Sequence, residues 1–341
     1  MNYNEVIEMA RPKLGKYCKG CPVCNGRACG NKIPGPGSKG FGDTAIRNYE
    51  AWRDIRVNMD CLVEAGEVDT SLELFGRTYK YPFFAGPVGA VQMHYGTEYT
   101  DMTYNEVLVD ACAQGGIMAF TGDGTNPDQT IAAANAIKKT GGVGIPVIKP
   151  WNKETIDEKM NLVKSAGVSA VAMDIDASGL PFLKNMTPPA GAKSVAEMKE
   201  IIKDAGLPFI IKGVMTVEGA RKAIEAGAAA IVVSNHGGRV LDGCPATAEV
   251  LEQIAAYVKA NSDMKVLVDG GIRSGLDVFR ALALGADGVL ICRPFVTAIY
   301  GAGAEGIQAY IDKIGSELRD TMEMCGVRSL KEIDRSKVWT K

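Results

Sequence analysis

Residues 208–239 have the sequence PFIIKGVMTVEGARKAIEAGAAAIVVSNHGGR, and this stretch decides the fold class. Its two ends, PFIIKGV at 208–214 and AIVVSN at 230–235, are continuous apolar runs of strand length. Between them, TVEGARKAIEAGA carries apolar residues at the three- and four-residue spacing of an amphipathic helix. Strands without polar alternation are typical of a parallel sheet that helices cover on both faces. The stretch therefore predicts a strand–helix–strand unit.

The same alternation continues on both sides of this unit, from residue 81 onwards. The run GLDVFRALALGA at 275–286 is again helical in its spacing. Eight strand–helix units in succession predict an α/β protein with a closed (β/α)8 TIM barrel. An open doubly wound sheet is the alternative, because closure leaves no mark on a linear sequence. The six further runs with strand character are YPFFAGPVGA (81–90), GIMAFTG (116–122), GVGIPVIKP (142–150), AVAMDID (170–176), KVLVDGG (265–271) and GVLICRPF (288–295).

The first 80 residues differ from the rest of the chain. Residues 33–42, IPGPGSKGFG, have the density of Gly and Pro that is typical of turns and loops. We find no second apolar core there, so we expect residues 1–80 to be a cysteine-rich N-terminal extension packed on a barrel formed by residues 81–341. The chain has 341 residues, and α/β barrels reach this size as one domain.

The charge balance favours a small-molecule substrate. Lys and Arg total 38 and Asp and Glu total 40, so the net charge of −2 gives no field that would attract nucleic acid or an anionic membrane. The sequence has no apolar run of about 18 residues that would predict a membrane span. Residues 1–18 lack the apolar core of a secretion signal. We expect a cytoplasmic protein with a small-molecule substrate.

Polar residues follow most of the predicted strands, at the end of a barrel where active sites lie. His236 is one of two histidines; it comes directly after a strand, and Arg239 follows two glycines later. A base beside a guanidinium that binds a carboxylate suits the removal of a proton from a hydroxy acid. The alternative is a structural histidine. The residues at the strand ends are Asp176, Lys212, His236, Asp269 and Arg293.

Two late segments, VDGGIRSG (268–275) and ICRPF (291–295), combine glycines with arginines. Glycines expose backbone N–H groups, and the helix that follows offers its N-terminus to an anion. With the charges of Arg273 and Arg293, the two segments favour a phosphate site, which lies at this end of many barrels. The alternative is a tight turn that merely requires glycine.

These motifs resemble the FMN-dependent 2-hydroxy-acid oxidases and dehydrogenases, a family that includes glycolate oxidase, lactate oxidase and flavocytochrome-type lactate dehydrogenases. The resemblance covers about residues 44–335. It implies an FMN-binding barrel enzyme, assembled as a homo-oligomer, that oxidises a small 2-hydroxy acid such as lactate or glycolate to the 2-oxo acid. The segments that carry it are IRNYEAWRDI (46–55), AGPVGA (85–90), IKGV (211–214), SNHGGR (234–239), DGGIRSG (269–275) and CRPF (292–295).

The resemblance also implies a role for each motif residue. His236 is the base, Asp176 pairs with it, and Lys212 stabilises the reduced, anionic flavin ring. Arg239 binds the substrate carboxylate. The residues expected to contact FMN are Pro87, Val88, Gly89, Lys212, Ser234, Asp269, Gly270, Gly271, Arg273 and Arg293.

Substrate recognition departs from the family pattern. Residues 33–42 stand where the family has a Tyr loop, and its third-strand Tyr is replaced near Lys149 or Trp151. The family's second Arg, after the fourth strand, is absent, and Asp174 replaces a Thr near the flavin. Lys149 or Lys184 is the candidate to bind the carboxylate instead, and we expect Lys149 to be substrate-binding, although Lys lacks the bidentate fork of Arg.

Four of the nine cysteines form a C-x2-C-x2-C-x4-C run. This spacing is close to ferredoxin-type iron–sulfur ligation, and four thiolates also suit tetrahedral zinc. We favour iron–sulfur, because a cluster beside a flavin gives electrons a way out; reactive thiols or the remnant of a lost site are the other readings. The predicted metal ligands are Cys18, Cys21, Cys24 and Cys29.

Three functions of different classes are compatible with these features. The first is oxidation of a 2-hydroxy acid, with an electron acceptor that the sequence does not name. The second is another FMN-dependent reaction, such as amine oxidation, isomerisation or reduction. The third is metal sensing or flavin storage, which has no need of His236 together with Asp176. We favour the first.

Overall fold

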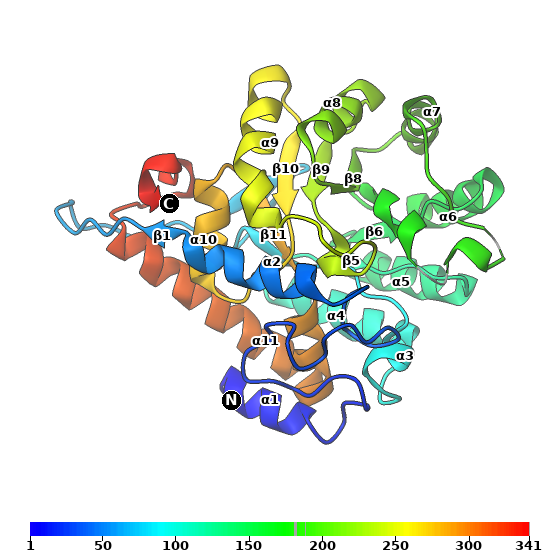
Figure 1. Ribbon diagram of the computed structural model, residues 1–341, viewed down its shortest axis with the longest axis horizontal. Coiled ribbons are helices and arrows are strands. Elements are labelled where there is room, and N and C mark those ends of the chain that lie inside the picture. The colour runs from blue at the N-terminus through cyan, green and yellow to red at the C-terminus, as the bar shows by residue number, and fades with distance from the viewer. Residues whose placement is uncertain (181–182, 188, 341) are drawn as a thin grey trace.

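The computed structural model describes residues 1–180, 183–187 and 189–340, and its centre is an eight-stranded parallel sheet (Figure 1). Each strand falls within one of the eight runs predicted from the sequence. The order across the sheet is β4-β11-β10-β9-β8-β7-β6-β5. The strands are β4 (Phe83–Ala85), β5 (Phe120–Thr121), β6 (Ile145–Ile148), β7 (Val171–Asp174), β8 (Phe209–Val214), β9 (Ala230–Val233), β10 (Lys265–Val268) and β11 (Gly288–Ile291).

The sheet closes on itself. A parallel bridge pairs Ala85 of β4 with Ala119, just before β5, and the N–H of Ala85 donates to the carbonyl of Met118 at 3.2 Å. The first and last members of the sheet are therefore neighbours. The predicted TIM barrel is confirmed, and the open doubly wound sheet is wrong.

A barrel helix follows each barrel strand, as the alternation of the sequence predicts, and a further short helix comes between the first strand and its barrel helix. Three more, α1 (Tyr3–Ala10), α2 (Asp43–Asp54) and α3 (Val91–Tyr95), lie outside this alternation. In the described part of the chain, no helix is both long enough and apolar enough to cross a membrane. The barrel helices are α4 (Asp101–Gln114), α5 (Pro127–Lys139), α6 (Lys153–Ser165), α7 (Val195–Ala205), α8 (Val217–Ala226), α9 (Thr247–Asn261), α10 (Gly275–Ala283) and α11 (Arg293–Met324).

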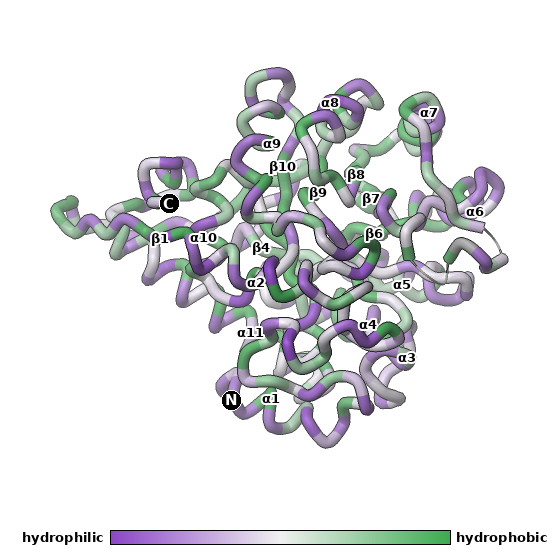
Figure 2. The backbone as a smooth tube through the Cα atoms, viewed as in Figure 1, coloured by the Kyte–Doolittle hydropathy of each residue, from purple (hydrophilic) through white to green (hydrophobic). Residues whose placement is uncertain are grey.

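The apolar pattern explains where these elements lie. Every residue of β7 and of β9 is buried, because helices cover the outside of the barrel and side chains fill its interior. Figure 2 shows hydrophobic strands at the centre and hydrophilic residues on the outer helical turns. The Thr216 and Ser274 side chains cap α8 and α10 by accepting a backbone N–H from the first turn. Each capped helix therefore starts shortly after its strand.

The N-terminal residues pack against the barrel at several places. Helix α1 lies along α11, where a Cβ at Gly301 would overlap the backbone of Val6. Strand β1 (Arg56–Val57) pairs with β12 (Val338–Trp339), and β2 (Leu72–Leu74) forms a hairpin with β3 (Arg77–Tyr79). Between α1 and α2 the chain reaches the segment after β9, since the N–H of Lys39 donates to the carbonyl of Gly238 at 2.9 Å. This contact brings the N-terminal loop to the mouth of the barrel.

Candidate active site

A cavity of about 300 Å³ opens at the carboxyl ends of the barrel strands. Its volume lies in the range of small-molecule sites. Two of the residues predicted for the site do not line it: Ser234 is fully buried, and Asp176 contacts His236. The predicted residues that line the cavity are Pro87, Val88, Gly89, Lys149, Lys212, His236, Arg239, Asp269, Gly270, Gly271, Arg273 and Arg293.

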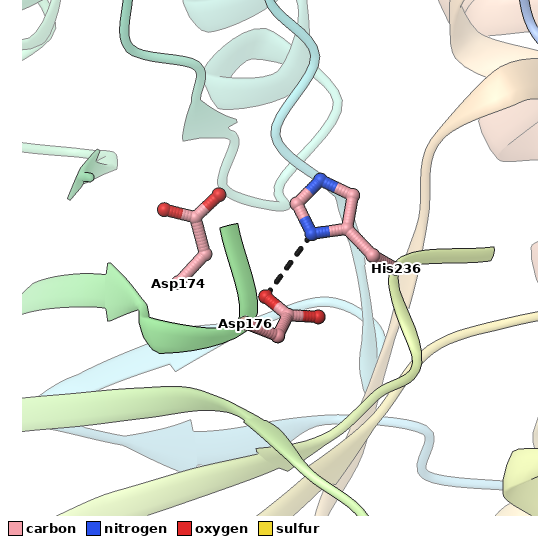
Figure 3. Close-up of side chains that lie close together, drawn as sticks. All are labelled: Asp174, Asp176 and His236. Atoms are coloured by element: carbon pink, nitrogen blue, oxygen red, sulfur yellow. Dashed lines mark hydrogen bonds and ion pairs between the residues drawn. The ribbon is translucent and has the colours of Figure 1, made fainter. Parts of the chain in front are cut away.

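His236, after β9, and Asp176, after β7, form a pair across the end of β8, which lies between these two strands. Nδ1 of His236 lies 3.1 Å from Oδ1 of Asp176, and Figure 3 shows the two groups facing each other. Burial alone would raise the pKa of Asp176, but the charges of His236 and Lys212 lower it below its ordinary value. The ionised carboxylate accepts the Nδ1–H of the imidazole, so Nε2 keeps a lone pair that can take a proton.

Lys212, in the second half of β8, is a buried cation, 2% exposed. Its Nζ donates to Oγ of Ser234 at 2.9 Å and lies 3.2 Å from Oδ2 of Asp269. Burial alone would lower the pKa of Lys212, but the carboxylates of Asp269, Asp176 and Asp174 raise it above its ordinary value. The lysine is therefore permanently charged, and Ser234 acts by holding it.

Arg239 contacts the N-terminal loop. Its Nη1 donates to the carbonyls of Gly35 at 2.6 Å and Gly37 at 2.9 Å. The side chain of Arg239 also lines the cavity, where its guanidinium can meet an anionic ligand. Residues 33–42, which replace the Tyr loop of the family pattern, thus position the predicted carboxylate-binding arginine.

Sequence reasoning missed His94, which helix α3 brings to the same cavity. Its Nε2 lies 3.2 Å from Nη2 of Arg239, and its Nδ1 accepts the N–H of Gly35 at 2.8 Å. Burial, and then the charge of Arg239, lower the pKa of His94 to about 3, so its ring is neutral. The one available signal was that the chain has only two histidines.

Lys149 lines the cavity in an ion pair. Its Nζ lies 2.9 Å from Oδ2 of Asp174, whose side chain is 4% exposed. Asp123, which sequence reasoning also missed, fixes this segment by accepting the backbone N–H of Lys149 and the indole N–H of Trp151. Lys149 is thus where it was expected, but Asp174 already balances its charge. The side chain of Lys184, the other candidate, lies outside what the structure describes.

The two segments that were predicted to bind phosphate also make packing contacts and hydrogen bonds within the protein. A Cβ at Gly271 would overlap the backbone carbonyl of Asn48, so close packing of α2 requires glycine there. Nε of Arg273 donates to the carbonyl of Cys24 at 2.7 Å. Nη1 of Arg293 is buried and has no hydrogen-bond partner among the described residues. Both arginines line the cavity. Of the two, only Arg293 has this unpartnered donor, which indicates that an anion binds there.

A second cavity, of about 340 Å³, adjoins the first. The two cavities share Pro36, Tyr95, Arg273 and Arg293 in their walls. Burial alone would raise the pKa of Cys24, but the charges of Arg273 and Arg293 lower it below its ordinary value. The cysteines that line this cavity are Cys18, Cys21, Cys24 and Cys29.

The polar groups around the first cavity fit a flavin mononucleotide. Buried polar atoms are normally hydrogen-bonded in a folded protein, yet several here have no partner within the described residues. A polar, anionic ligand beside Lys212 and Arg293 would satisfy part of this set. The atoms concerned are Gln129 Nε2, Asp174 Oδ1, Asp269 Oδ1 and Arg293 Nη1.

The sequence is similar to that of known proteins over most of its length. Residues 36–185 and 181–340 match the family described as FMN-dependent dehydrogenase. The peroxisomal (S)-2-hydroxyacid oxidase GLO3 of Arabidopsis thaliana is 30% identical over 87% of this chain and 88% of its own length. The 4-hydroxymandelate oxidase of Amycolatopsis orientalis is 30% identical over 89% of this chain and 94% of its own length.

Solved structures show the same architecture. A mandelate oxidase variant with 2-hydroxy-phenylacetamide superposes with a TM-score of 0.81 at 26% identity, over 100% of this chain and 98% of its own. A flavocytochrome b2 variant with pyruvate bound superposes with a TM-score of 0.77 at 25% identity, over 89% of this chain and 80% of its own.

Proposed function

The chain belongs to the family of FMN-dependent dehydrogenases, and on that premise we propose that it oxidises a small 2-hydroxy acid, of the size of lactate or glycolate, to the 2-oxo acid. It is an FMN-dependent oxidoreductase that acts on CH–OH groups. One observation carries the substrate class. His236, oriented by ionised Asp176, faces the same cavity as Arg239, so a base and a carboxylate-binding cation serve one ligand.

His236 takes the hydroxyl proton at Nε2 while the hydrogen on the α-carbon leaves as hydride. Asp176 holds the ring through Nδ1–H and stabilises the imidazolium that forms, because the two charges lie 3.1 Å apart. A positioned base of this kind contributes about 10²–10⁴-fold to a reaction rate.

Arg239, which lines the cavity, binds the substrate carboxylate from one side of its guanidinium. The other side of the guanidinium is held by the carbonyls of Gly35 and Gly37. This anchoring fixes the direction in which the arginine faces before a ligand arrives, and it lowers the entropy lost on binding.

FMN, when bound, supplies the acceptor of the hydride. Lys212, held by Asp269 and Ser234, is placed to stabilise negative charge on the reduced ring. Arg293 and the glycines after β10 are placed to hold the phosphate. A metal centre at the four cysteines is the second cofactor of this proposal; the proton and hydride steps themselves use only groups of the first cavity.

One observation favours a second candidate function. Asp174 neutralises Lys149, so this lysine is not free to pair with the substrate carboxylate. Another FMN-dependent redox or isomerase reaction, on a substrate without a 2-hydroxy acid group, would suit that arrangement.

An anaerobic absorbance spectrum tests the proposal. We expect the flavin bands of the purified protein to bleach with D-lactate, L-lactate or glycolate. The variant His236→Gln should keep the bands and bleach at least about 100-fold more slowly, since the base is lost. Bands that stay oxidised with every hydroxy acid would contradict this function and favour the second candidate.

A further inference from the structure

The four cysteines of the N-terminal run surround a single space. Cys18, Cys21, Cys24 and Cys29 all line the cavity of about 340 Å³, and each is a free, half-buried thiol. Four thiols from twelve residues that converge on one space form a ligand set. The residues assigned to proton and hydride transfer lie elsewhere, so the reaction itself leaves this set without a role.

The loop that carries the cysteines is fixed in place. Gly20 and Gly26 have φ values of 53° and 84°, which allow the tight turns between successive thiols. Nε of Arg11 donates to the carbonyl of Gly20 at 2.9 Å. A Cβ at Gly26 would press on the backbone of Ala45 in α2. The thiols are therefore held by the fold and are not loose surface groups.

Two cations face the thiols from the barrel. Nη2 of Arg273 lies 3.8 Å from Sγ of Cys24, and its Nε binds the carbonyl of the same residue. Arg293 lines the cavity as well, with a buried Nη1 that has no partner among the described residues. Metal centres with four thiolates are anionic, so the cavity supplies the opposite charge that such a centre needs.

The distances between the thiols bear on the choice between the two metals that their sequence allows. A Zn–S bond of about 2.3 Å places the sulfurs of a tetrahedral zinc site about 3.8 Å apart. Among the described residues, no three of the four Sγ atoms lie within 4.8 Å of one another. A cubane cluster holds its thiolates further apart than zinc does, because iron and sulfide ions lie between them. The four sulfurs are therefore not gathered as closely as a bound zinc ion would hold them, and the larger centre does not require them to be.

The cysteine cavity lies next to the flavin site. The two cavities share part of their walls, which is formed by Pro36, Tyr95, Arg273 and Arg293. Arg273 contacts the cysteine loop directly and also lines the first cavity. A redox centre at this position would adjoin the flavin without occupying the substrate site.

We propose that Cys18, Cys21, Cys24 and Cys29 bind a [4Fe–4S] cluster that takes electrons from the reduced flavin and passes them, one at a time, to an external one-electron carrier. The source of the electrons rests on the proposed function; the cluster itself does not. Oxidation of one hydroxy acid releases two electrons and two protons. Two successive one-electron transfers reduce two carrier molecules, return the flavin and the cluster to their oxidised forms, and release the protons to water.

Metal analysis of the full-length protein, purified without oxygen, tests the site. We expect about four iron and four sulfide ions per chain. Cys21→Ser should lose most of both, whereas Cys61→Ser, an exposed cysteine outside the run, should keep the wild-type content. Zinc as the only metal, or no iron after anaerobic reconstitution with iron and sulfide, would overturn the cluster.

The electron route is tested with cytochrome c, a bulky one-electron acceptor. In Cys21→Ser we expect the ratio of cytochrome c reduction to anaerobic flavin bleaching to fall at least tenfold, and in Cys61→Ser to stay constant. A ratio that is unchanged in Cys21→Ser overturns the route. If no hydroxy acid bleaches the flavin, the proposed function fails, but the iron content and the electron paramagnetic resonance signal of dithionite-reduced protein still decide the cluster.

Discussion

Nη2 of Arg239 lies 3.2 Å from Nε2 of His94, although 145 residues separate them in the chain. Both side chains line the first cavity, and the N–H of Gly35 donates to the other nitrogen of the same imidazole. A neutral imidazole accepts only one hydrogen bond. Because Nδ1 accepts the N–H of Gly35, Nε2 carries the ring proton, and Nη2 of Arg239 has no acceptor in this imidazole.

The neutral state of His94 predicts a pH dependence of stability. Its pKa of about 3 in the folded protein lies below the value of about 6.5 for an unfolded chain. Between these values the unfolded state binds a proton that the folded state does not, so stability falls as pH decreases from about 6.5. Relative to His94→Gln, we expect the wild type to lose at most about 2 kcal/mol between pH 7.5 and 5. A stability difference from chemical denaturation that is equal at both pH values would contradict this.

Asp176→Asn should leave the flavin bound and impair the base. The amide cannot hold Nδ1–H as an ionised carboxylate does, and it does not stabilise the imidazolium. We expect anaerobic flavin bleaching by the hydroxy acid to slow by about 100-fold or more. The matched control is Asp263→Asn at an exposed position. A variant of Asp176 as fast as this control would remove Asp176 from the mechanism.

The Lys149–Asp174 pair should show strong coupling. Removing one partner of a buried pair leaves an unpaired charge and costs about 3–5 kcal/mol of stability. We therefore expect Lys149→Met to destabilise the protein more than the double variant Lys149→Met/Asp174→Asn does. Urea denaturation of wild type, both single variants and the double variant measures the coupling. Additive effects would mean that the two side chains act independently.

Gly271→Ala should destabilise the protein beyond the cost of its backbone conformation. Gly271 has a φ of 81°, and Gly141, at 69°, is the matched control, because a Cβ there meets nothing within 4 Å. The left-handed conformation costs an alanine about 1–2 kcal/mol at either position. The overlap with Asn48 should add about 1–3 kcal/mol at Gly271 alone. If thermal unfolding shows that the two variants lose the same free energy of unfolding, α2 moves aside without cost.

The barrel could be predicted because its signal is local. Each strand is a short apolar run and each helix has its own periodicity, so eight units are visible without knowledge of any contact. His236 and Arg239 were found for the same reason, since both follow the same strand and lie in one segment of four residues. Location in the cytoplasm and assembly as a homo-oligomer stay predictions.

His94, Asp123 and the second contact of Arg273 could not be predicted in this way. His94 is on a short helix after the first barrel strand, and its partner Arg239 follows the sixth. In the sequence, Asp123 is indistinguishable from an ordinary loop residue. Only the fold brings Trp151 and Lys149 to it. No local spacing encodes which loops meet at the mouth of a barrel.

The sequence by itself determined the order of strands and helices, the base with its neighbouring arginine, and a four-cysteine run of metal-binding spacing. Only the tertiary structure decided that the N-terminal loop holds Arg239, that Asp174 neutralises Lys149, and that the cysteines adjoin the flavin cavity. The physical reason is barrel closure, which brings the carboxyl ends of all eight strands to one face. Charges far apart in the chain then share one low-dielectric space, and their pairing depends on distances that periodicity does not contain.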